Sequence, residues 1–225
     1  MNLHKMKKVD IIWAAEHTCK HRHSYLDHPR CFDLEHPAMR GRRGYLDIET
    51  FGLDASFGVM LSWCLKPAGD SHILHDVFTS RDITREKPGE EDRRIVASVV
   101  DAIRQFDLII THYGNDWRFD MPFVRTRACA MHIPFPEYGR IRQLDTYPIL
   151  KSKFRLKSNR QEHAVRALLG KTEKTHVEGH IWRAAMRGDK KALSYVLDHN
   201  RRDVRDLERL WDTISVASAE RSTRV

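Results

Sequence analysis

Four acidic residues in three separated segments have the types and spacing of a metal-dependent hydrolytic site. Asp47 and Glu49 alternate in Y-L-D-I-E-T-F-G-L, Asp120 stands in R-F-D-M-P-F-V, and Asp203 stands in H-N-R-R-D-V. Alternate residues of a strand point the same way, so Asp47 and Glu49 project from one face. Clustered carboxylates repel one another unless a cation neutralises them, and their hard oxygens suit Mg²⁺ or Mn²⁺. Four converging carboxylates are what a two-metal phosphodiester-cleaving site requires.

Taken singly, each acidic residue also has a simpler interpretation. Asp47 and Glu49 could be solvated charges at a strand edge, although their neighbours Leu46 and Ile48 are apolar. Asp120 could cap the helix that starts beside it, a common use of aspartate. Asp203 falls in the middle of an expected helix, where solvent exposure is normal.

The elements that must position these residues follow from hydrophobic periodicity and turn signals. Three expected strands, with turns at 67–69 and 80–82, predict an antiparallel meander. Short apolar segments then alternate with helical patterns. The expected strands are 45–50, 57–65, 71–78, 107–111 and 141–145, and the expected helices are 90–106, 119–130, 146–154, 161–169, 181–186 and about 190–215. This order indicates an α/β fold whose mixed sheet has a meander and then parallel strands, with helices against it.

The composition indicates a soluble globular protein with a basic surface. The chain has 225 residues, 41% of them hydrophobic and 31% charged, and no apolar run approaches the roughly 20 residues that span a bilayer. The amino terminus lacks a small-residue cleavage site, so no signal peptide is expected. A net charge of +8 favours a polyanionic partner, although many solvated proteins are simply basic. Cys64 and Cys129 lie in apolar segments and are expected to be core thiols in a reducing cytoplasm.

The segments with the four carboxylates resemble, in order and spacing, the DEDD superfamily of 3′-to-5′ exonucleases. The resemblance is to its ribonuclease H-like exonuclease branch, found in bacteria and phages, and runs from about residue 45 to residue 211. The matching pieces are D-I-E-T-F-G-L (47–53), N-D-W-R-F-D-M-P-F-V (115–124), L-D-T-Y (144–147), L-K-S-N-R (156–160), and W-R-A-A-M-R-G-D through H-N-R-R-D-V-R-D-L-E-R-L (182–210).

This resemblance implies a ribonuclease H-like fold and a substrate, DNA or RNA, with a free 3′ end. By position, Asp47, Glu49, Asp120 and Asp203 would hold two Mg²⁺ or Mn²⁺ ions. In the family, one ion activates the attacking water and the other stabilises the leaving 3′ oxygen. With such an activity the chain could work alone, beside a polymerase, or in a repair or phage replication assembly.

The last motif departs from the family pattern at the residue expected to act as a base. One class has a tyrosine four residues before the last aspartate, and another has a histidine five residues before it; here His199 stands at the four-residue position. The i, i+4 spacing puts His199 and Asp203 on one helix face. A histidine there could accept a proton from the attacking water at neutral pH. A surface histidine, or a contribution from Tyr195, is the alternative.

Contacts to the nucleic acid are expected on both sides of the carboxylates. The backbone near Thr50 should approach a terminal nucleotide, and Leu53 and Asn115 match family positions, Leu53 being the one that wedges against the last base. A segment of basic residues around Phe154 suits a single-stranded backbone in a groove. Its basic residues are Lys151, Lys153, Arg155, Lys157 and Arg160. The alternative is an ordinary solvated connection between elements.

Residues 1–43 form a His/Cys-rich arm before the core domain, 44–215, and a tail, 216–225. Two cysteines and three histidines of this arm could supply a tetrahedral zinc site. They are Cys19, His21, His23, His28 and Cys31. The alternative is a polar, partly helical arm whose histidines contact nucleic acid or solvent.

Three other functions compete with an exonuclease. The domain could be a nucleic-acid-binding module that has lost catalysis, although its four carboxylates are intact. It could be a structure-specific endonuclease of the same fold, which would need a groove that admits an internal strand. The function could instead lie in the arm, as in a zinc-dependent binding protein.

Overall fold

The computed structural model describes residues 8–35, 42–115, 118–137, 140–173 and 175–217. It divides into two compact units, Met1–Arg42 and Arg43–Val225, which are described separately below. The expected carboxyl-terminal tail lies outside the described residues from residue 218 onward.

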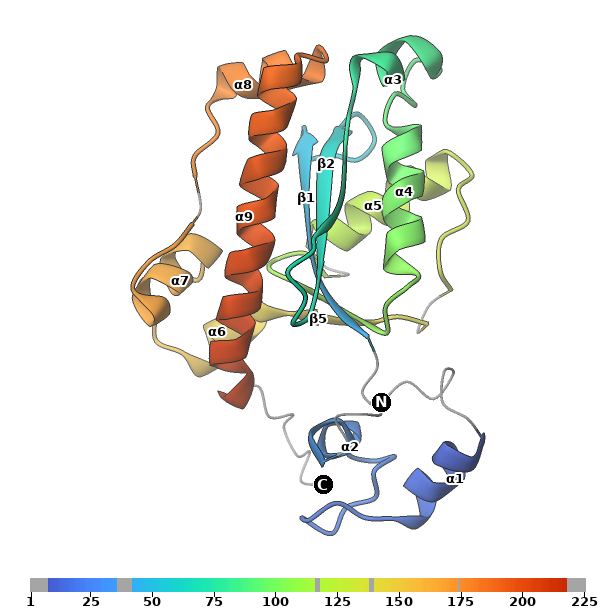
Figure 1. The fold of residues 1–225 in the computed structure, drawn as a ribbon, viewed down its shortest axis with the longest axis vertical. Helices are drawn as coiled ribbons and strands as arrows, with labels where there is room; N and C mark the ends of the chain where they lie inside the picture. Colours follow the sequence, from blue (N-terminus) through green and yellow to red (C-terminus); the bar gives the residue numbers. More distant parts are fainter. Residues whose placement is uncertain (1–7, 36–41, 116–117, 138–139, 174, 218–225) are drawn as a thin grey trace. The chain divides into compact units, whose positions relative to one another are not determined.

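A five-stranded mixed sheet forms the centre of the larger unit (Figure 1). Its strands are β1 (Arg43–Phe51), β2 (Val59–Pro67), β3 (Leu74–Val77), β4 (Leu108–Thr111) and β5 (Arg142–Asp145). In space they follow the order β3-β2-β1-β4-β5. The first three strands pair antiparallel, whereas β4 runs parallel to β1, and β5 parallel to β4. The predicted meander followed by parallel strands is confirmed.

Helices pack on both faces of this sheet. One face carries α4 and α5, and the other carries the long helix α9 with α6, α7 and α8 beside it (Figure 1). Their bounds are α3 (Ser80–Arg85), α4 (Arg93–Ile103), α5 (Asp120–Ala130), α6 (Thr146–Lys153), α7 (Gln161–Leu169), α8 (Gly179–Met186) and α9 (Lys190–Ile214), followed by a short 3₁₀ turn, η2 (Ser215–Ala217). Because both faces are covered, every residue of β2 is buried.

Hydrophobic spacing explains where the covering helices form. In α4 the buried residues recur every three to four positions, as the sequence predicted, and they pack against Leu46 and Ile48 of β1. The adjacent β1 residue, Tyr45, points to the opposite face and packs under α9. The same alternation places Asp47 and Glu49 on the α9 side of the sheet.

Two expectations about local structure were wrong. The turn expected at 80–82 is the first turn of α3, because the Asp82 carboxylate accepts hydrogen bonds from Thr79 N and Thr79 Oγ1, both at 2.8 Å, and ion-pairs with Arg94. Cys129 is exposed, whereas Cys64 is buried as expected. The apolar contacts of α5 are made by other residues of that helix, so Cys129 falls on its solvent side.

The smaller unit contains two short helices, α1 (Lys8–Glu16) and α2 (Pro29–Glu35), joined by a tight loop. An isolated bridge between Thr18 and Ser24 closes this loop. Ala14, Cys19, Tyr25 and Phe32 are the buried residues of its small core. We call residues 8–35 the head.

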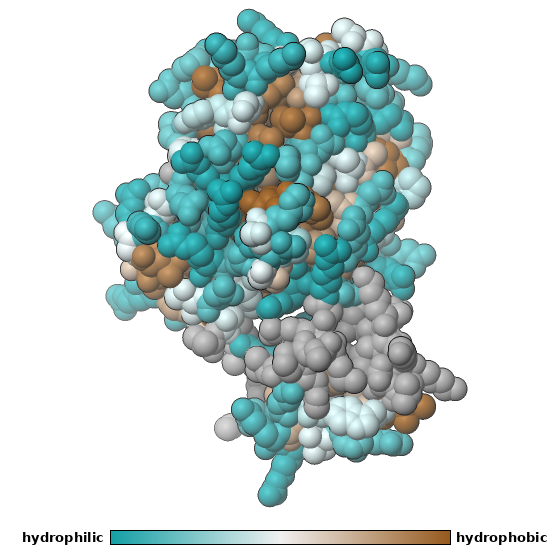
Figure 2. Space-filling model, viewed as in Figure 1, coloured by the Kyte–Doolittle hydropathy of each residue, from teal (hydrophilic) through white to brown (hydrophobic). Residues whose placement is uncertain are grey.

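The surface agrees with the charged composition. On the face seen in Figure 2, hydrophilic residues cover most of the larger unit, and apolar residues form small separate areas. Among the helices of the described residues, none is long and apolar enough to cross a membrane.

Candidate functional site

Strand β1 presents Asp47 and Glu49 to helix α9. Asp47 Oδ2 accepts a hydrogen bond of 2.6 Å from Nδ2 of Asn200, a fully buried residue of α9. This contact ties the strand to the helix and fixes one oxygen of the carboxylate. A register shift in the β1–β2 pairing follows Glu49, so the alternation that aligns the two acids ends there.

Asp120 reaches the same region from the first turn of α5. Its Oδ1 accepts a hydrogen bond of 3.0 Å from Ile48 N, which lies between Asp47 and Glu49 in the strand. The residue at the cap position of α5 is Phe119, so the capping interpretation of Asp120 was wrong. Burial raises the pKa of Asp120 to about 7, and the negative charges of Asp145 and Asp203 act in the same direction.

The loop between β4 and α5 allows this close approach. The Asp145 carboxylate, at the end of β5, accepts from Tyr113 N at 2.8 Å and from Gly114 N at 3.1 Å. These bonds hold Tyr113 in the left-handed region, at φ 64°. A Cβ added to Gly114 would overlap with the Asp120 carboxylate, so a residue without a side chain lets Asp120 pack here.

Helix α9 supplies His199 and Asp203 on one face, as the i, i+4 spacing predicted. His199 Nε2 lies 3.4 Å from Glu49 Oε1 and 3.8 Å from Asp203 Oδ2. Its Nδ1 lies 2.8 Å from Thr175 Oγ1. Asp203 and His199 are both buried, so the simpler expectations of an exposed aspartate and a surface histidine were wrong. The hydroxyl of Tyr195 donates instead to the His176 carbonyl oxygen at 3.1 Å.

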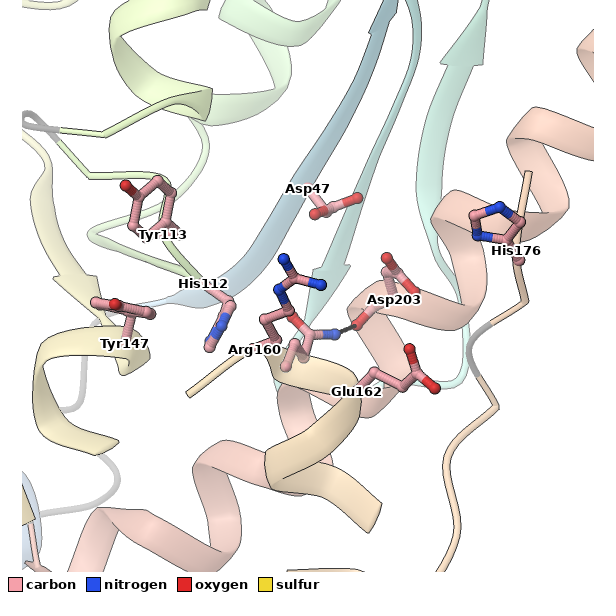
Figure 3. A pocket seen from close by; sticks show the side chains of 9 residues that line it. Asp47, His112, Tyr113, Tyr147, Arg160, Glu162, His176 and Asp203 are labelled. Atoms are coloured by element: carbon pink, nitrogen blue, oxygen red, sulfur yellow. Dashed lines mark hydrogen bonds between the residues drawn. The ribbon is translucent and has the colours of Figure 1, made fainter. Parts of the chain in front are cut away.

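Two cavities border the carboxylates. The first, of about 630 Å³, is bordered by Asp47 and Asp203; Figure 3 shows these two on one side and the rings of Tyr113 and Tyr147 on the other. The second, of about 550 Å³, is bordered by Glu49 and by the residues that follow it. The second cavity is lined by Thr50, Phe51, Gly52, Leu53, Phe119, Gly179, Trp182 and Arg183.

An aromatic cluster forms one wall of the first cavity. The rings of Tyr113 and Tyr147 meet edge to face at 4.9 Å, and the Arg118 guanidinium lies over both, 4.5 Å and 5.0 Å from their centroids. His112 meets Tyr147 at 5.9 Å and contacts Thr146 Oγ1 through its Nδ1. The cavity therefore combines flat rings with carboxylates and the basic side chain of Arg160.

Only some of the residues predicted to contact nucleic acid line these cavities. Thr50 and Leu53 line the second cavity, where Leu53 is 83% exposed, and Arg160 lines the first. Asn115 lies in the loop after β4, where its backbone N–H faces Asp145 Oδ2 at 3.4 Å. The four remaining basic residues are exposed on α6 and the loop after it, and do not line either cavity: Lys151, Lys153, Arg155 and Lys157.

Several residues of the site were missed by the sequence reasoning. Asn200 is adjacent to His199 and three residues before Asp203, a helical spacing that could have flagged it. Asp145 and Tyr147 stand in the matched L-D-T-Y piece but had no assigned role. Thr175 offered no signal, because its contact with His199 depends on how the chain before α8 folds back on α9.

The carboxylates of the larger unit suit divalent cations that prefer hard oxygen ligands. Carboxylate oxygens of Glu49 and Asp203 lie within 4.8 Å of each other and of a ring nitrogen of His199, and Asp47 borders the same cavity as Asp203. The raised pKa of Asp120 shows that its negative charge is poorly compensated by the protein alone. A cation among these oxygens would provide that compensation.

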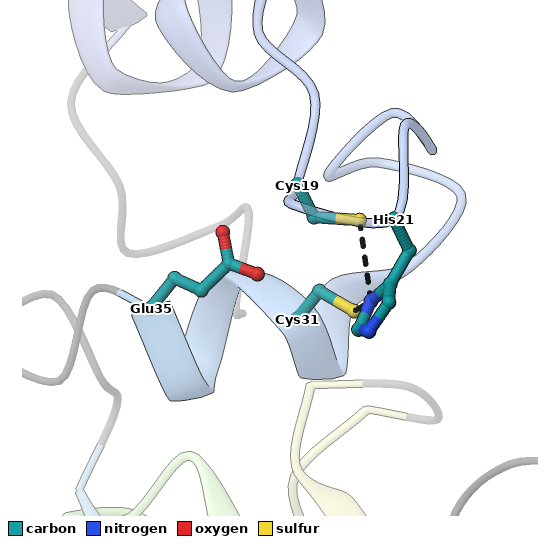
Figure 4. Close-up of side chains that lie close together, drawn as sticks. All are labelled: Cys19, His21, Cys31 and Glu35. Atoms are coloured by element: carbon teal, nitrogen blue, oxygen red, sulfur yellow. Dashed lines mark hydrogen bonds between the residues drawn. The ribbon is translucent and has the colours of Figure 1, made fainter.

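The predicted zinc ligands of the head fall into two groups. Cys19, His21 and Cys31 come together, with Glu35 as a fourth member that the sequence reasoning did not name (Figure 4). His23 and His28 instead stack on each other, with ring centroids 4.0 Å apart.

Comparison with known families identifies the larger unit. A family model described as the RNase_H superfamily matches residues 44–215, which include the four carboxylates and His199 and exclude the head. No curated protein matches the chain. The mixed sheet and its flanking helices are the ribonuclease H-like α/β fold that the sequence predicted.

Proposed function

The chain belongs to the ribonuclease H superfamily, and from that premise we propose that it is a metal-dependent nuclease that removes nucleotides from the 3′ end of DNA or RNA. Superfamily membership supports a nuclease acting on nucleic acid. The direction of cleavage, the preference for an end and the use of two metal ions are the finer parts of the proposal.

The observation that carries the proposal is the convergence of acidic residues from three distant segments. Three contacts bring these residues together: Ile48 N of β1 donates to Asp120 of α5, Asn200 of α9 donates to Asp47 of β1, and His199 lies beside both Glu49 of β1 and Asp203 of α9. Solvated surface charges would not make such contacts with neighbouring side chains and backbone groups. Asp120 and Asp203 are instead almost fully buried, at 4% and 3% exposed.

In this proposal the four carboxylates hold two Mg²⁺ or Mn²⁺ ions. When bound, such ions activate a water for attack on phosphorus and stabilise the leaving 3′ oxygen. The protein's own contribution is to hold the oxygens in place: Asn200 fixes Asp47, and the Ile48 N–H fixes Asp120.

His199 is the proposed acceptor of the proton from the attacking water. With Nδ1 donating to Thr175 Oγ1, Nε2 faces Glu49 and Asp203 and can take up a proton beside them. Thr175 is then a positioning residue, because it sets the orientation of the ring.

The two cavities supply binding surfaces for the ends of a nucleic-acid strand. Tyr113 and Tyr147 offer rings against which a base can stack, and Arg160 offers a positive charge for a phosphate. In the second cavity, Leu53 and Trp182 offer apolar surface for the base of the last nucleotide. An exposed apolar residue beside the carboxylates favours an end-binding enzyme over one that admits an internal strand.

The test compares linear and circular oligonucleotides of DNA and RNA in the presence of Mg²⁺ or Mn²⁺. We expect a 3′ label to appear at once as a mononucleotide, a 5′ label to give a shortening ladder, and the circles to stay intact. Asp47→Asn should abolish all cleavage. The matched control is Asp101→Asn, an exposed aspartate of α4 paired with Arg104, which should cleave like the wild type.

Each other result assigns a different function. Equal cleavage by the wild type and by Asp47→Asn would show that the carboxylates do not take part in cleavage. Cleavage of circles would identify an endonuclease of the same fold. Binding of oligonucleotides without any cleavage, with either metal, would identify a binding module.

A further inference from the structure

The head contains a cluster of sulfur, nitrogen and oxygen donors that the proposed nuclease site does not use. Cys31 Sγ lies 3.5 Å and Cys19 Sγ 3.9 Å from His21 Nδ1, and the ligand atoms of these residues and Glu35 all lie within 4.8 Å of one another (Figure 4). Each of the four residues is of a type that binds transition metals.

The two sulfur–nitrogen distances are close to those of a tetrahedron around zinc. Zinc binds sulfur at about 2.3 Å and nitrogen at about 2.0–2.1 Å, so tetrahedral ligands are about 3.6 Å apart for a sulfur–nitrogen edge. The two sulfur–nitrogen distances in the head, 3.5 Å and 3.9 Å, lie on either side of that value. The sulfur and nitrogen atoms are therefore already spaced for one ion.

Local structure explains how nearby residues reach this arrangement. Cys19 and His21 belong to a tight turn, in which Arg22 N donates to Cys19 O at 2.7 Å and Cys19 N to His23 O at 2.9 Å. Arg22 adopts the left-handed conformation, at φ 65°, that reverses the chain. Cys31 and Glu35 are four residues apart in α2 and thus share a helix face.

Glu35 is held in place by groups outside the cluster. Its Oε2 accepts a hydrogen bond of 2.8 Å from the Tyr25 hydroxyl, and the backbone N–H of Lys20 approaches Oε1 at 3.3 Å. Support of this kind for a ligating carboxylate is typical of protein metal sites.

Among the residues of the head whose burial the structure describes, the apolar core is small. Ala14, Cys19, Tyr25 and Phe32 are buried, with Trp13 and Cys31 packed against them. Units below about 40 residues usually need disulfides, metals or association to fold. The cluster spans this core, because Cys19 and Cys31 belong to both.

We propose that Cys19, His21, Cys31 and Glu35 bind one Zn²⁺ ion that holds the head together, a structural site separate from the nuclease carboxylates. Two thiolates, an imidazole and a carboxylate select zinc over Mg²⁺ or Mn²⁺, which prefer oxygen ligands alone. His23 and His28 lie outside the ligand set, since their rings stack on each other.

The first measurement is the metal content of the full chain, purified from zinc-supplemented cells and dialysed. We expect one zinc per chain in the wild type, and also in His23→Ala, His28→Ala and Asp203→Asn. Zinc should be lost in Cys19→Ser, His21→Ala and Cys31→Ser. Cys129→Ser, which removes an exposed cysteine of the larger unit, is the matched control and should keep its zinc.

Because the ligand variants could lose zinc by misfolding alone, cobalt substitution of the wild type provides an independent readout. Co²⁺ in the proposed site should give tetrahedral visible bands and thiolate-to-cobalt charge transfer, and Asp47→Asn should give the same spectrum. An octahedral spectrum without charge transfer would overturn the proposal. So would a Cys19–Cys31 disulfide in the protein purified under reducing conditions, or equal zinc loss in His23→Ala and Cys31→Ser.

Discussion

The cluster in the head and the carboxylates of the larger unit differ in the distance along the chain that each must bridge. The head cluster takes all its members from residues 19–35, through one turn and one short helix. The carboxylates come from β1, α5 and α9, and the hydrogen bond from Ile48 to Asp120 joins residues 72 positions apart. The first cluster forms locally, whereas the second exists only when the whole sheet is assembled.

The two clusters also differ in their donor atoms. Thiolates and an imidazole suit a structural zinc site, while carboxylate oxygens beside two cavities suit a site that admits a substrate. We infer that metal stabilises the fold in the head, and that in the larger unit the fold holds the metal for chemistry. Three experiments test this difference, in order of decreasing expected effect.

The largest effect is expected from the two histidines, His21 and His199. His199→Ala should lower turnover roughly 10²–10⁴-fold, the usual range for general acid–base help, while zinc content and Mn²⁺ affinity stay nearly unchanged. His21→Ala should do the reverse, losing zinc and keeping turnover. Single-turnover kinetics and metal analysis of both variants provide the measurement.

His72→Ala, which changes an exposed histidine, is the control for both. If turnover of His199→Ala falls by less than about threefold, another group accepts the proton. Thr175→Val should reduce turnover less than His199→Ala and in the same direction, because it only misorients the ring.

The second effect concerns the stability of the protein without divalent ions. The pKa of Asp120 is about 7 in the folded state against 3.8 for an aspartate in an unfolded chain, so the folded state binds this proton more tightly. The free energy of unfolding should therefore fall as pH rises from about 4 to about 7, by on the order of 4 kcal/mol. Urea unfolding followed by circular dichroism at several pH values measures this slope.

Asp120→Asn should flatten the slope, and Asp101→Asn should leave it unchanged. Added Mn²⁺ at pH 8 should restore stability to the wild type and less to Asp120→Asn, because the cation compensates the same charge. A wild type and an Asp120→Asn variant with identical slopes would contradict the burial argument.

The smallest effect is expected on substrate affinity, a property of the nuclease site and not of the zinc site in the head. Tyr147→Ala should raise KM for single-stranded DNA with little change in kcat. The loss of one stacked base, about 1–3 kcal/mol, corresponds to roughly 5- to 150-fold. Tyr147→Phe keeps the ring and should retain the wild-type KM. If both variants raise KM equally, the hydroxyl and not the stacking surface makes the contact.

Local patterns were enough to predict the sheet, the long final helix and the shared faces of the acidic residues. The period of two in β1 places Asp47 beside Glu49, and the helical period in α9 places His199 beside Asp203. Contacts between distant segments were beyond such patterns. Asn200 reaches Asp47 across 153 residues, and nothing in either segment alone specifies that pair.

In the head, the sequence predicted a cluster and named three of its members, Cys19, His21 and Cys31, but also named His23 and His28 and did not name Glu35. Five candidates of similar spacing stand in this segment, and only the turn at Arg22 separates His21 from His23. Glu35 was missed because a carboxylate four residues after a cysteine is an ordinary helical feature until the turn brings Cys19 and His21 against it.

Gly114 has a consequence for recognising active relatives. Any side chain at this position would displace the Asp120 carboxylate, whose position Ile48 N fixes, while leaving every acidic residue in the sequence. On the proposed function, we expect a protein with all four carboxylates and an alanine here to match the acidic motifs and yet to have lost cleavage. Inventories of active members should therefore score the glycine six residues before the third carboxylate together with the acids themselves.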